Sequence, residues 1–458
     1  MKKTINSVIR SLVLFMLIIM VSCNFSKTNS TSVPISYSAT ETQPSGSGQV
    51  SFYTPTNGSK DQSDKNQIFD FMINGVPADH NLLFFSLSKS DNLEGINFYS
   101  ANTQTGDWNC LSCNLNLDKS NVSLQIRLPP GLSVDHQNLA IQGEVFEGTP
   151  DNNQFSGLWL VNLRKGGIRV IQSSNKFIGY SFPVWSPDDS KIASFTDDGH
   201  VNIINVSNGE QILPLNSVTQ WKSETDQTDF DRPSMDLSWS PDGKYFIYNT
   251  LSAYPVRVNF NTLTARILSP FNNNKARIYF PAFSPAGTQI LFSSDALNRN
   301  TGLSYDQWSL NPKISVYAFS ATDLFIMNID GNEEHCLTCG NVPGLVFAPS
   351  WSPDGKHIVF FDYDLSHFPD IFENIDVIDT DGANMRNLAR FPSNGPGDYV
   401  DYKISGPPSW SVDGKQIAFS ALNGGNQGIY VVNVDGSDLR LVVSQSGQDF
   451  VFPLWLDK

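Results

Sequence analysis

The chain has 458 residues, of which 40% are hydrophobic and 12% aromatic, and its formal net charge at pH 7 is −15. This acidic balance argues against nucleic-acid binding and against electrostatic adhesion to anionic lipid. Apolar residues at helical spacing are nearly absent, so the length indicates one large all-β body.

Residues 1–22 have the features of a secretory signal: basic residues precede an apolar run that is far shorter than the about 20 residues of a spanning helix. The sequence Val21-Ser22-Cys23 resembles a bacterial lipobox, which implies cleavage before Cys23 and a diacylglycerol on its thiol. An ordinary signal peptide with a coincidental cysteine is the alternative. Loss of the signal takes the formal charge from −15 to −18, because Lys2, Lys3 and Arg10 leave with it.

Residues 23–66 are rich in Ser, Thr, Asn and Gly, which predicts a flexible tether. Signal, lipid and tether together predict an exported protein anchored to the bacterial membrane or envelope, facing outside the cytoplasm. The lipid rather than charge would hold it there, because the mature chain is strongly acidic.

Residues 67–458 contain seven copies of one short hairpin, spaced by roughly 45 to 70 residues, which is typical of stacked repeats. The copy at 351–360 (WSPDGKHIVF) is the best preserved. Pro353 presets φ for a turn, Asp354 bonds back to the backbone, and Gly355 permits positive φ. The other copies lie at 76–84, 132–141, 185–195, 239–248, 283–292 and 410–419, and the first two of these are decayed.

Each strand that follows the turn is apolar on consecutive residues, so both of its faces need burial. About twenty residues later a second hairpin follows, as at 326–331, 375–382 and 429–436. Two hairpins give four strands, which make one blade of a β-propeller.

The blade resembles that of the TolB-like, WD-repeat-like β-propellers, whose consensus P-x-W-S-P-D-G-K-x-I-x-F and I-Y-x-x-N-x-D-G is matched nearly throughout 407–441. The resemblance implies four-stranded blades, seven in number, or six if the copy at Asp79 is not a true blade. Phe452-Pro453-Leu454-Trp455 looks like one more innermost strand, able to close the ring by completing the N-terminal blade. TolB itself carries an α/β domain ahead of its propeller, and this sequence shows no alternating helix and strand pattern for such a domain. The resemblance therefore does not imply that this chain shares the partners of TolB.

Two C-x-x-C pairs, Cys110/Cys113 and Cys336/Cys339, occupy the end of an outermost strand. Such pairs indicate a disulfide, zinc or redox chemistry, while haem attachment is excluded because no His follows either pair. A single four-cysteine zinc site would require two distant blades to meet. In an exported protein the pairs predict two local disulfides.

Long insertions at 218–236, 294–320, 363–374 and 391–404 all project from one face of the predicted disc, because the other face carries the short Asp-Gly turns. Long loops on a rigid scaffold are where binding residues concentrate. Aromatic and acidic side chains on this face suit a glycan, a cationic peptide or a protein; merely tolerated surface loops are the alternative. The candidate binding residues are Trp221, Asp229, Asp231, Tyr305, Trp308, His367, Phe368, Asp370, Tyr399, Asp401 and Tyr402.

The sequence has no G-x-S-x-G nucleophile elbow, no P-loop and no H-E-x-x-H motif, and its six histidines are scattered among the blades. We therefore predict no cofactor, no metal and no catalytic residue, and a monomer that binds a protein, peptide or glycan at the cell surface. The competing hypothesis is an extracytoplasmic lyase or hydrolase with residues that converge over the central channel, His367 among them.

Overall fold

A computed structural model of the chain divides it into two compact units, Met1–Gly58 and Ser59–Lys458. The structure describes residues 71–88, 96–113, 122–147, 153–174, 183–195, 201–212, 222–223, 233–250, 254–268, 277–296, 322–339, 341–342, 344–364, 366, 371–393, 406–423 and 426–457, all in the second unit. Within these ranges no helix is long and apolar enough to cross a membrane.

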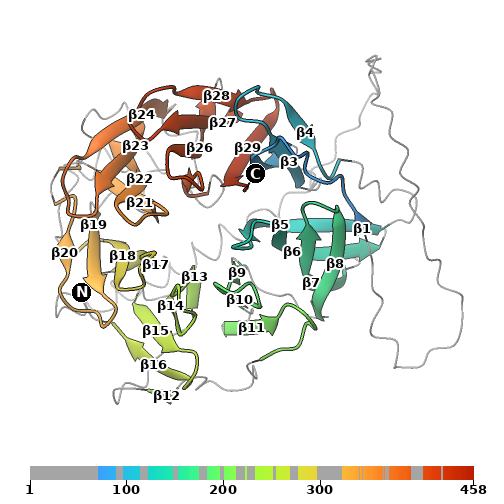
Figure 1. Cartoon of the computed structure of the whole chain (residues 1–458), viewed down its shortest axis with the longest axis horizontal. Helices are drawn as coiled ribbons and strands as arrows, with labels where there is room; N and C mark the ends of the chain where they lie inside the picture. The colour runs from blue at the N-terminus through green and yellow to red at the C-terminus, as the bar shows by residue number, and fades with distance from the viewer. Residues whose placement is uncertain are drawn as a thin grey trace, which may run out of the picture. The chain divides into compact units, whose positions relative to one another are not determined.

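The described residues of the second unit form seven sheets arranged in a ring (Figure 1), which we number as blades 1 to 7. Blade 1 is β29 (Gln448–Trp455), β2 (Leu82–Ser88), β3 (Asn97–Ala101) and β4 (Trp108–Cys110); blade 2 is β5 (Val122–Leu132), β6 (Asn138–Glu147), β7 (Asn153–Asn162), β8 (Gly167–Ser174) and β1 (Phe71–Met72). Blade 3 is β9 (Val184–Trp185), β10 (Lys191–Phe195) and β11 (Val201–Asn205); blade 4 is β13 (Pro233–Trp239), β14 (Tyr245–Thr250), β15 (Pro255–Asn259), β16 (Thr264–Ile267) and β12 (Lys222–Ser223).

The remaining three blades each have four strands in chain order. Blade 5 is β17 (Ile278–Phe283), β18 (Gln289–Ser294), β19 (Asp323–Asn328) and β20 (His335–Cys336). Blade 6 is β21 (Leu345–Trp351), β22 (His357–Asp364), β23 (Ile371–Asp379) and β24 (Arg386–Ser393), and blade 7 is β25 (Ser409–Trp410), β26 (Gln416–Asn423), β27 (Asn426–Asn433) and β28 (Arg440–Val443). The all-β propeller predicted from the repeat is therefore confirmed, with seven blades rather than six.

The copy at Asp79 belongs to a true blade, because the C-terminal strand β29 pairs with β2 from Ser88↔Gln448 to Leu82↔Trp455. The predicted ring closure by the tail is thus confirmed. It joins the two ends of the repeat region in one sheet and leaves β2 as an interior strand rather than an exposed edge.

The repeated turn is held by its own side chains. In blade 6 the Ser352 hydroxyl accepts the backbone N–H of His357 (2.9 Å) and donates to Asp354 Oδ1 (2.7 Å). This hydrogen bond is the main reason that the pKa of Asp354 lies below its usual value. Gly355 has φ 69°, a conformation that favours glycine. These contacts explain why Ser, Asp and Gly recur together.

Tryptophan links neighbouring blades through its indole N–H. Trp410 Nε1 donates to the carbonyl of Ser350 in blade 6 (3.1 Å), and Trp455 Nε1 donates to the carbonyl of Ser409 in blade 7 (2.9 Å). Trp185, Trp239 and Trp351 make the same bond to the blade before them. In blade 5 the equivalent residue is Phe283, which has no donor.

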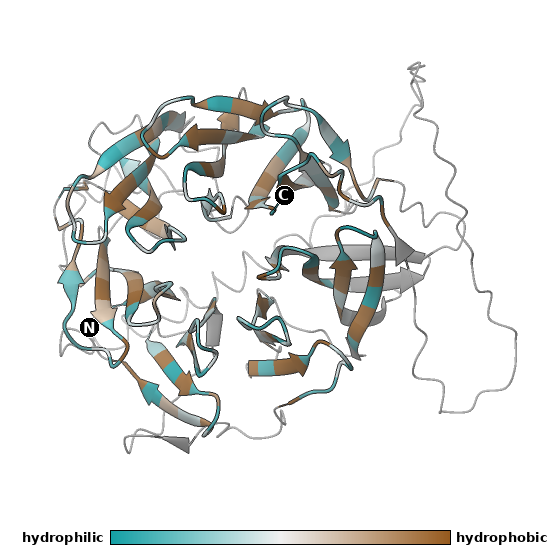
Figure 2. Ribbon diagram, viewed as in Figure 1, coloured by the Kyte–Doolittle hydropathy of each residue, from teal (hydrophilic) through white to brown (hydrophobic). Residues whose placement is uncertain are grey.

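The core consists of the apolar layers between adjacent blades, and Figure 2 shows hydrophobic residues along the strands of the ring. In β22, Ile358 and Phe360 pack toward blade 5, while Val359 and Phe361 pack toward blade 7, and all four side chains are buried. Both faces of the strand are therefore covered, as the consecutive apolar residues predict.

Candidate functional site

In blade 6, the last residues of β22 depart from the apolar pattern of the repeat. After Phe361, β22 continues as Asp362-Tyr363-Asp364, so that two carboxylates follow Phe360 on the face turned toward blade 5. Asp362 pairs with Asn374 of β23, and Asn374 pairs with Arg390 of β24. Strand alternation thus places a row of polar side chains across one sheet.

These side chains line an open pocket of about 530 Å³ between blade 6 and the segment that follows blade 5. Its wall combines three carboxylates, two guanidinium groups and three amides with two apolar side chains. The lining residues are Asn341, Val342, Asp362, Asp364, Asn374, Asp376, Met385, Arg386, Asn387 and Arg390.

Hydrogen bonds hold most of the pocket's polar groups in place. Asn374 Nδ2 donates to Asp362 Oδ2 (3.0 Å), and Asn387 Nδ2 donates to Asp376 Oδ1 (2.8 Å). A guanidinium nitrogen of Arg390 lies 3.0 Å from a carboxylate oxygen of Asp364. These contacts preorganise the wall before any ligand arrives.

Two oxygen atoms of the wall have no hydrogen-bond partner among the described residues: Oδ1 of Asp362 and Oδ1 of Asn374. Both side chains are buried, with 2% and 6% of their surface exposed. A buried acceptor without a donor costs roughly 1–3 kcal/mol, and more if it is charged. The pocket therefore carries two acceptors that a ligand's donors can satisfy.

Burial controls the ionisation of the carboxyls. It raises the pKa of Asp362 to about 7, against the lowering effect of the Asn374 hydrogen bond, and it raises the pKa of Asp376 to about 6. For Asp364 burial acts in the same direction, but hydrogen bonds from Ser366 and the charge of Arg390 outweigh it and leave its pKa below the usual value. Asp362 and Asp376 therefore change protonation close to neutral pH.

A further buried carboxyl lies on the opposite face of blade 6. Glu373 pairs with Tyr363 and Phe391 on the neighbouring strands, and burial alone raises its pKa to about 8. It does not line the pocket, so it serves as an internal reference for the effect of burial without the pocket's chemistry.

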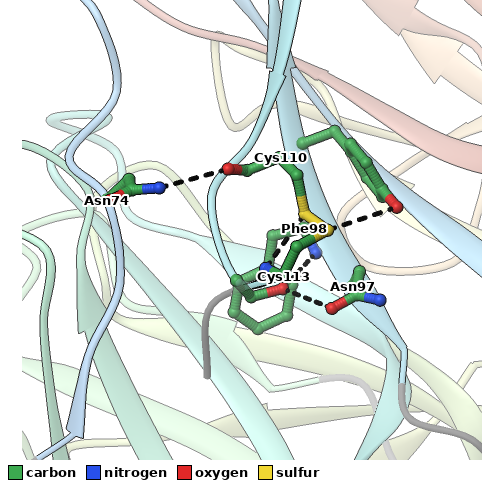
Figure 3. The surroundings of a disulfide bond; sticks show 7 residues. Asn74, Asn97, Phe98, Cys110 and Cys113 are labelled. Atoms are coloured by element: carbon green, nitrogen blue, oxygen red, sulfur yellow. Dashed lines mark hydrogen bonds between the residues drawn. A yellow bond between two sulfur atoms is a disulfide. The ribbon is translucent and has the colours of Figure 1, made fainter. Parts of the chain in front are cut away.

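The two cysteine pairs form disulfides, Cys110–Cys113 and Cys336–Cys339, as predicted. Figure 3 shows the first, where the hydroxyl of Ser112 accepts the backbone N–H of Phe98 (2.9 Å) and donates to Asn97 (3.0 Å).

The second disulfide repeats this arrangement. Thr338 accepts the backbone N–H of Leu324 (3.0 Å) and donates to Asp323 (2.9 Å), as Ser112 does in blade 1. Each C-L-[S/T]-C segment therefore ties a strand end to its neighbour. No group of three His, Cys, Asp or Glu residues suited to a metal occurs among the described residues.

The predicted binding residues and Cys23 lie outside the described residues. This applies to Trp221, Asp229, Asp231, Tyr305, Trp308, His367, Phe368, Asp370, Tyr399, Asp401 and Tyr402.

The strands that flank the predicted insertions are described. β22 ends at Asp364 and β23 begins at Ile371, so the connection that contains His367 is shorter than the predicted 363–374. This connection joins the two strands at the end of the sheet where Asp364 lies. The carboxylates and amides of the pocket were not predicted, although Asp362, Asp364 and Asp376 interrupt apolar runs and so gave a visible signal.

No family model matches the chain. The uncharacterized protein Atu1656 of Agrobacterium fabrum (strain C58) is 24% identical over 190 residues, which are 41% of this chain and 54% of that protein. The chain thus spans about half the length of this relative.

Three solved structures are similar to the chain. A protein from Agrobacterium tumefaciens assigned as a TolB has a TM-score of 0.41 at 16% identity, covering 77% of this chain and 98% of its own. An oligogalacturonate lyase in complex with manganese has a TM-score of 0.48 at 13% identity (83% and 88%). The Swd1 β-propeller domain of Myceliophteria thermophila has a TM-score of 0.44 at 12% identity (70% and 88%). The chain itself forms a seven-bladed β-propeller, as its described sheets show.

Proposed function

We propose that the protein is an exported, membrane-anchored propeller that binds a protein or peptide through the face carrying its long connections, without transforming it. The observation that carries the proposal is the pair of buried, unsatisfied acceptors on Asp362 and Asn374, at the end of blade 6. Buried polar atoms normally have partners, so a pair of orphans that line an open pocket supports a ligand as the missing donor.

Export is supported by the two disulfides. Disulfides persist in oxidising compartments and are rare where glutathione keeps thiols reduced. Together with the signal-like residues 1–22 and the lipobox-like Val21-Ser22-Cys23, they support a protein that faces outside the cytoplasm and is held by lipid.

The anchor is tested by fractionation. Cys23→Ala should move the protein from the membrane fraction to the soluble exported fraction, with Cys23→Ser as a second variant that lacks the acylated thiol. Retention of both variants in the membrane fraction would contradict lipidation. Alkylation of the native protein without reductant should label none of the other four cysteines.

Partner binding is tested by capture from the membranes of the source cells. Segments 365–370 and 394–405 are replaced by Gly-Ser segments of equal length, and the control replaces Asn261–Thr262 in a short turn of blade 4 on the opposite face. Loss of the same partner with both long-connection variants, and not with the control, supports the proposal. A partner retained by all three variants would refute the assignment of the face.

The second candidate function is an extracytoplasmic lyase or hydrolase. One observation favours it: Asp362 and Asp376 line the same pocket and have pKa values raised to about 7 and about 6, near the range in which carboxyls act as general acids and bases. Asp376→Asn distinguishes the candidates. Turnover of an envelope polysaccharide that falls at least 100-fold in the variant would establish an enzyme, whereas a binding module has no turnover to lose.

A further inference from the structure

We infer that the pocket between blades 5 and 6 binds a primary ammonium group, the side chain of a lysine in the peptide partner, and that it releases this group in acid. The inference rests on the proposed function for the identity of the partner, but the pocket's chemistry stands on its own residues. Its core is the cross-strand pair of Asp362 and Asn374.

The orientation of the Asn374 amide follows from its neighbour. Its Nδ2 donates to Asp362 Oδ2, because the opposite orientation would set an amide oxygen against a carboxylate oxygen. Asn374 Oδ1 is therefore an acceptor, and the residue that pairs with Asn374 across the strands carries the second free acceptor, Asp362 Oδ1. A ligand that satisfies both atoms must present at least two donors.

The ligand must be a cation. Asp362, Asp364 and Asp376 all line the pocket, and each of its two guanidinium groups already has a partner. Arg390 pairs with Asp364 and stacks on Phe372 at 3.9 Å from the ring centroid, and Arg386 donates to the carbonyl of Val434 (2.9 Å). Asp362 has no ion pair among the described residues, so its charge is left for a ligand.

An ammonium fits this geometry better than a guanidinium. Arginine recognises a carboxylate best when its forked guanidinium donates to both carboxylate oxygens. Asp362 offers only Oδ1, because Oδ2 already accepts a hydrogen bond from Asn374. A lysine ammonium is a compact charge with three donors, which can reach Asp362 Oδ1 and Asn374 Oδ1 together. A metal ion is disfavoured, because the described residues supply no suitable three-ligand group.

Acid release follows from the groups that face the ligand. These are Asp362 and Asp364 on β22, Asp376 on β23, and Arg386 and Arg390 on β24; the side facing them contributes the neutral Asn341 and Val342. Ionised Asp362 attracts the ammonium, and protonated Asp362 does not. Because burial raises the pKa of this carboxyl to about 7, affinity should be full above that pH and fall below it. One such proton corresponds to a loss of roughly 100-fold between pH 8 and pH 5.

The test uses the full-length chain and calorimetric titration with Nα-acetyl-lysine methylamide. At pH 8 we expect saturable 1:1 binding that weakens at least tenfold at pH 5 and in Asp362→Asn. Glu373→Gln is the matched control, because it removes a buried carboxyl from the other face of the same strand pair and should leave affinity unchanged. Nα-acetyl-arginine methylamide and glucosamine should bind at least tenfold more weakly.

Several results would overturn the inference: no binding of the lysine compound at pH 8, equal binding by Asp362→Asn, or tighter binding of the arginine compound or of glucosamine. Thermal unfolding of Asp362→Asn shows whether a loss reflects misfolding. Lysine binding without a partner captured through the long connections would contradict the proposed function alone. Capture of a partner with unchanged affinity for Asp362→Asn would contradict the pocket assignment alone.

Discussion

Blades 6 and 7 have nearly the same turn and the same strand register, but the polar pocket described above is lined by residues of blade 6. Counted from Trp351 and Trp410, Asp362 occupies the position of Ala421. Ala421 is fully buried and faces Gly428 across the strands, whereas Asp362 faces Asn374. The repeat thus determines the turn and the first residues of the strand that follows it. The later residues of that strand vary between blades, and in blade 6 they are the polar residues that line the pocket.

The strongest test of this comparison places the charge of blade 6 in blade 7. Ala421→Asp buries a carboxyl opposite Gly428, which offers no amide to bind it, and should lower the free energy of unfolding by about 3 kcal/mol or more. Ala421→Ser, the residue type of Ser294 at this position in blade 5, should change it far less. Chemical denaturation measures both. Equal stability of the Asp variant would show that any blade tolerates this charge.

Between pH 5 and pH 8 the pH dependence of stability should come from blade 6 and not from blade 7, whose Asp413 and Asp435 have pKa values below their usual range. The folded pKa values of Asp362 (about 7) and Glu373 (about 8) lie above those of the unfolded chain, so the folded state binds more protons between pH 4 and pH 8. Their contribution to stability is present in acid and is lost as pH rises through this window.

We expect each of these carboxyls to contribute about 3 kcal/mol of destabilisation from pH 5 to pH 8, Glu373 more than Asp362 because its pKa is raised further. Asp362→Asn and Glu373→Gln should each flatten the dependence when unfolding is followed by denaturant titration at both pH values. Asp107→Asn, which alters an exposed carboxyl in blade 1, is the control. A slope unchanged in both buried-site variants would refute the burial argument.

The smallest expected effect on stability concerns the tryptophan hydrogen bond to the preceding blade, which blades 6 and 7 both have. Trp351→Phe and Trp410→Phe remove the indole donor to the preceding blade and keep most of the ring, so each should lower stability by about 1 kcal/mol. Phe283 shows that a blade can lack this donor. Similar losses from both variants would support equivalent roles. A loss above about 3 kcal/mol would indicate lost packing instead.

Local chemistry explains how much of the fold could be predicted from the sequence. Short runs of residues identify the Ser-Pro-Asp-Gly turns, the paired cysteines and the tail at Phe452–Trp455, and the structure confirms the blades, the disulfides and the closure. The tail's Trp455 donates to the carbonyl of Ser409, which is the bond that the tryptophans of other blades make to the blade before them.

The candidate site could not be predicted in the same way. Asp362, Asn374 and Arg390 meet only when three strands pair in register, and the empty acceptors appear only once burial is known. The lengths of the loops predicted binding residues such as His367 and Tyr399, which lie outside the described residues. No binding role was predicted for the polar residues of β22 and β23. A strand such as β22, in which carboxylates follow an apolar run, indicates a polar pocket more directly than the length of a loop does.

The closure of blade 1 also constrains the order of folding. Its innermost strand, β29, follows every other described blade in the chain, yet it pairs with β2 near the start of the repeats. Non-local pairing of this kind carries a large loop-closure entropy and slows folding. The ring can therefore close only after β29 has reached β2, whereas each of blades 3 to 7 is built from strands that are consecutive in the chain.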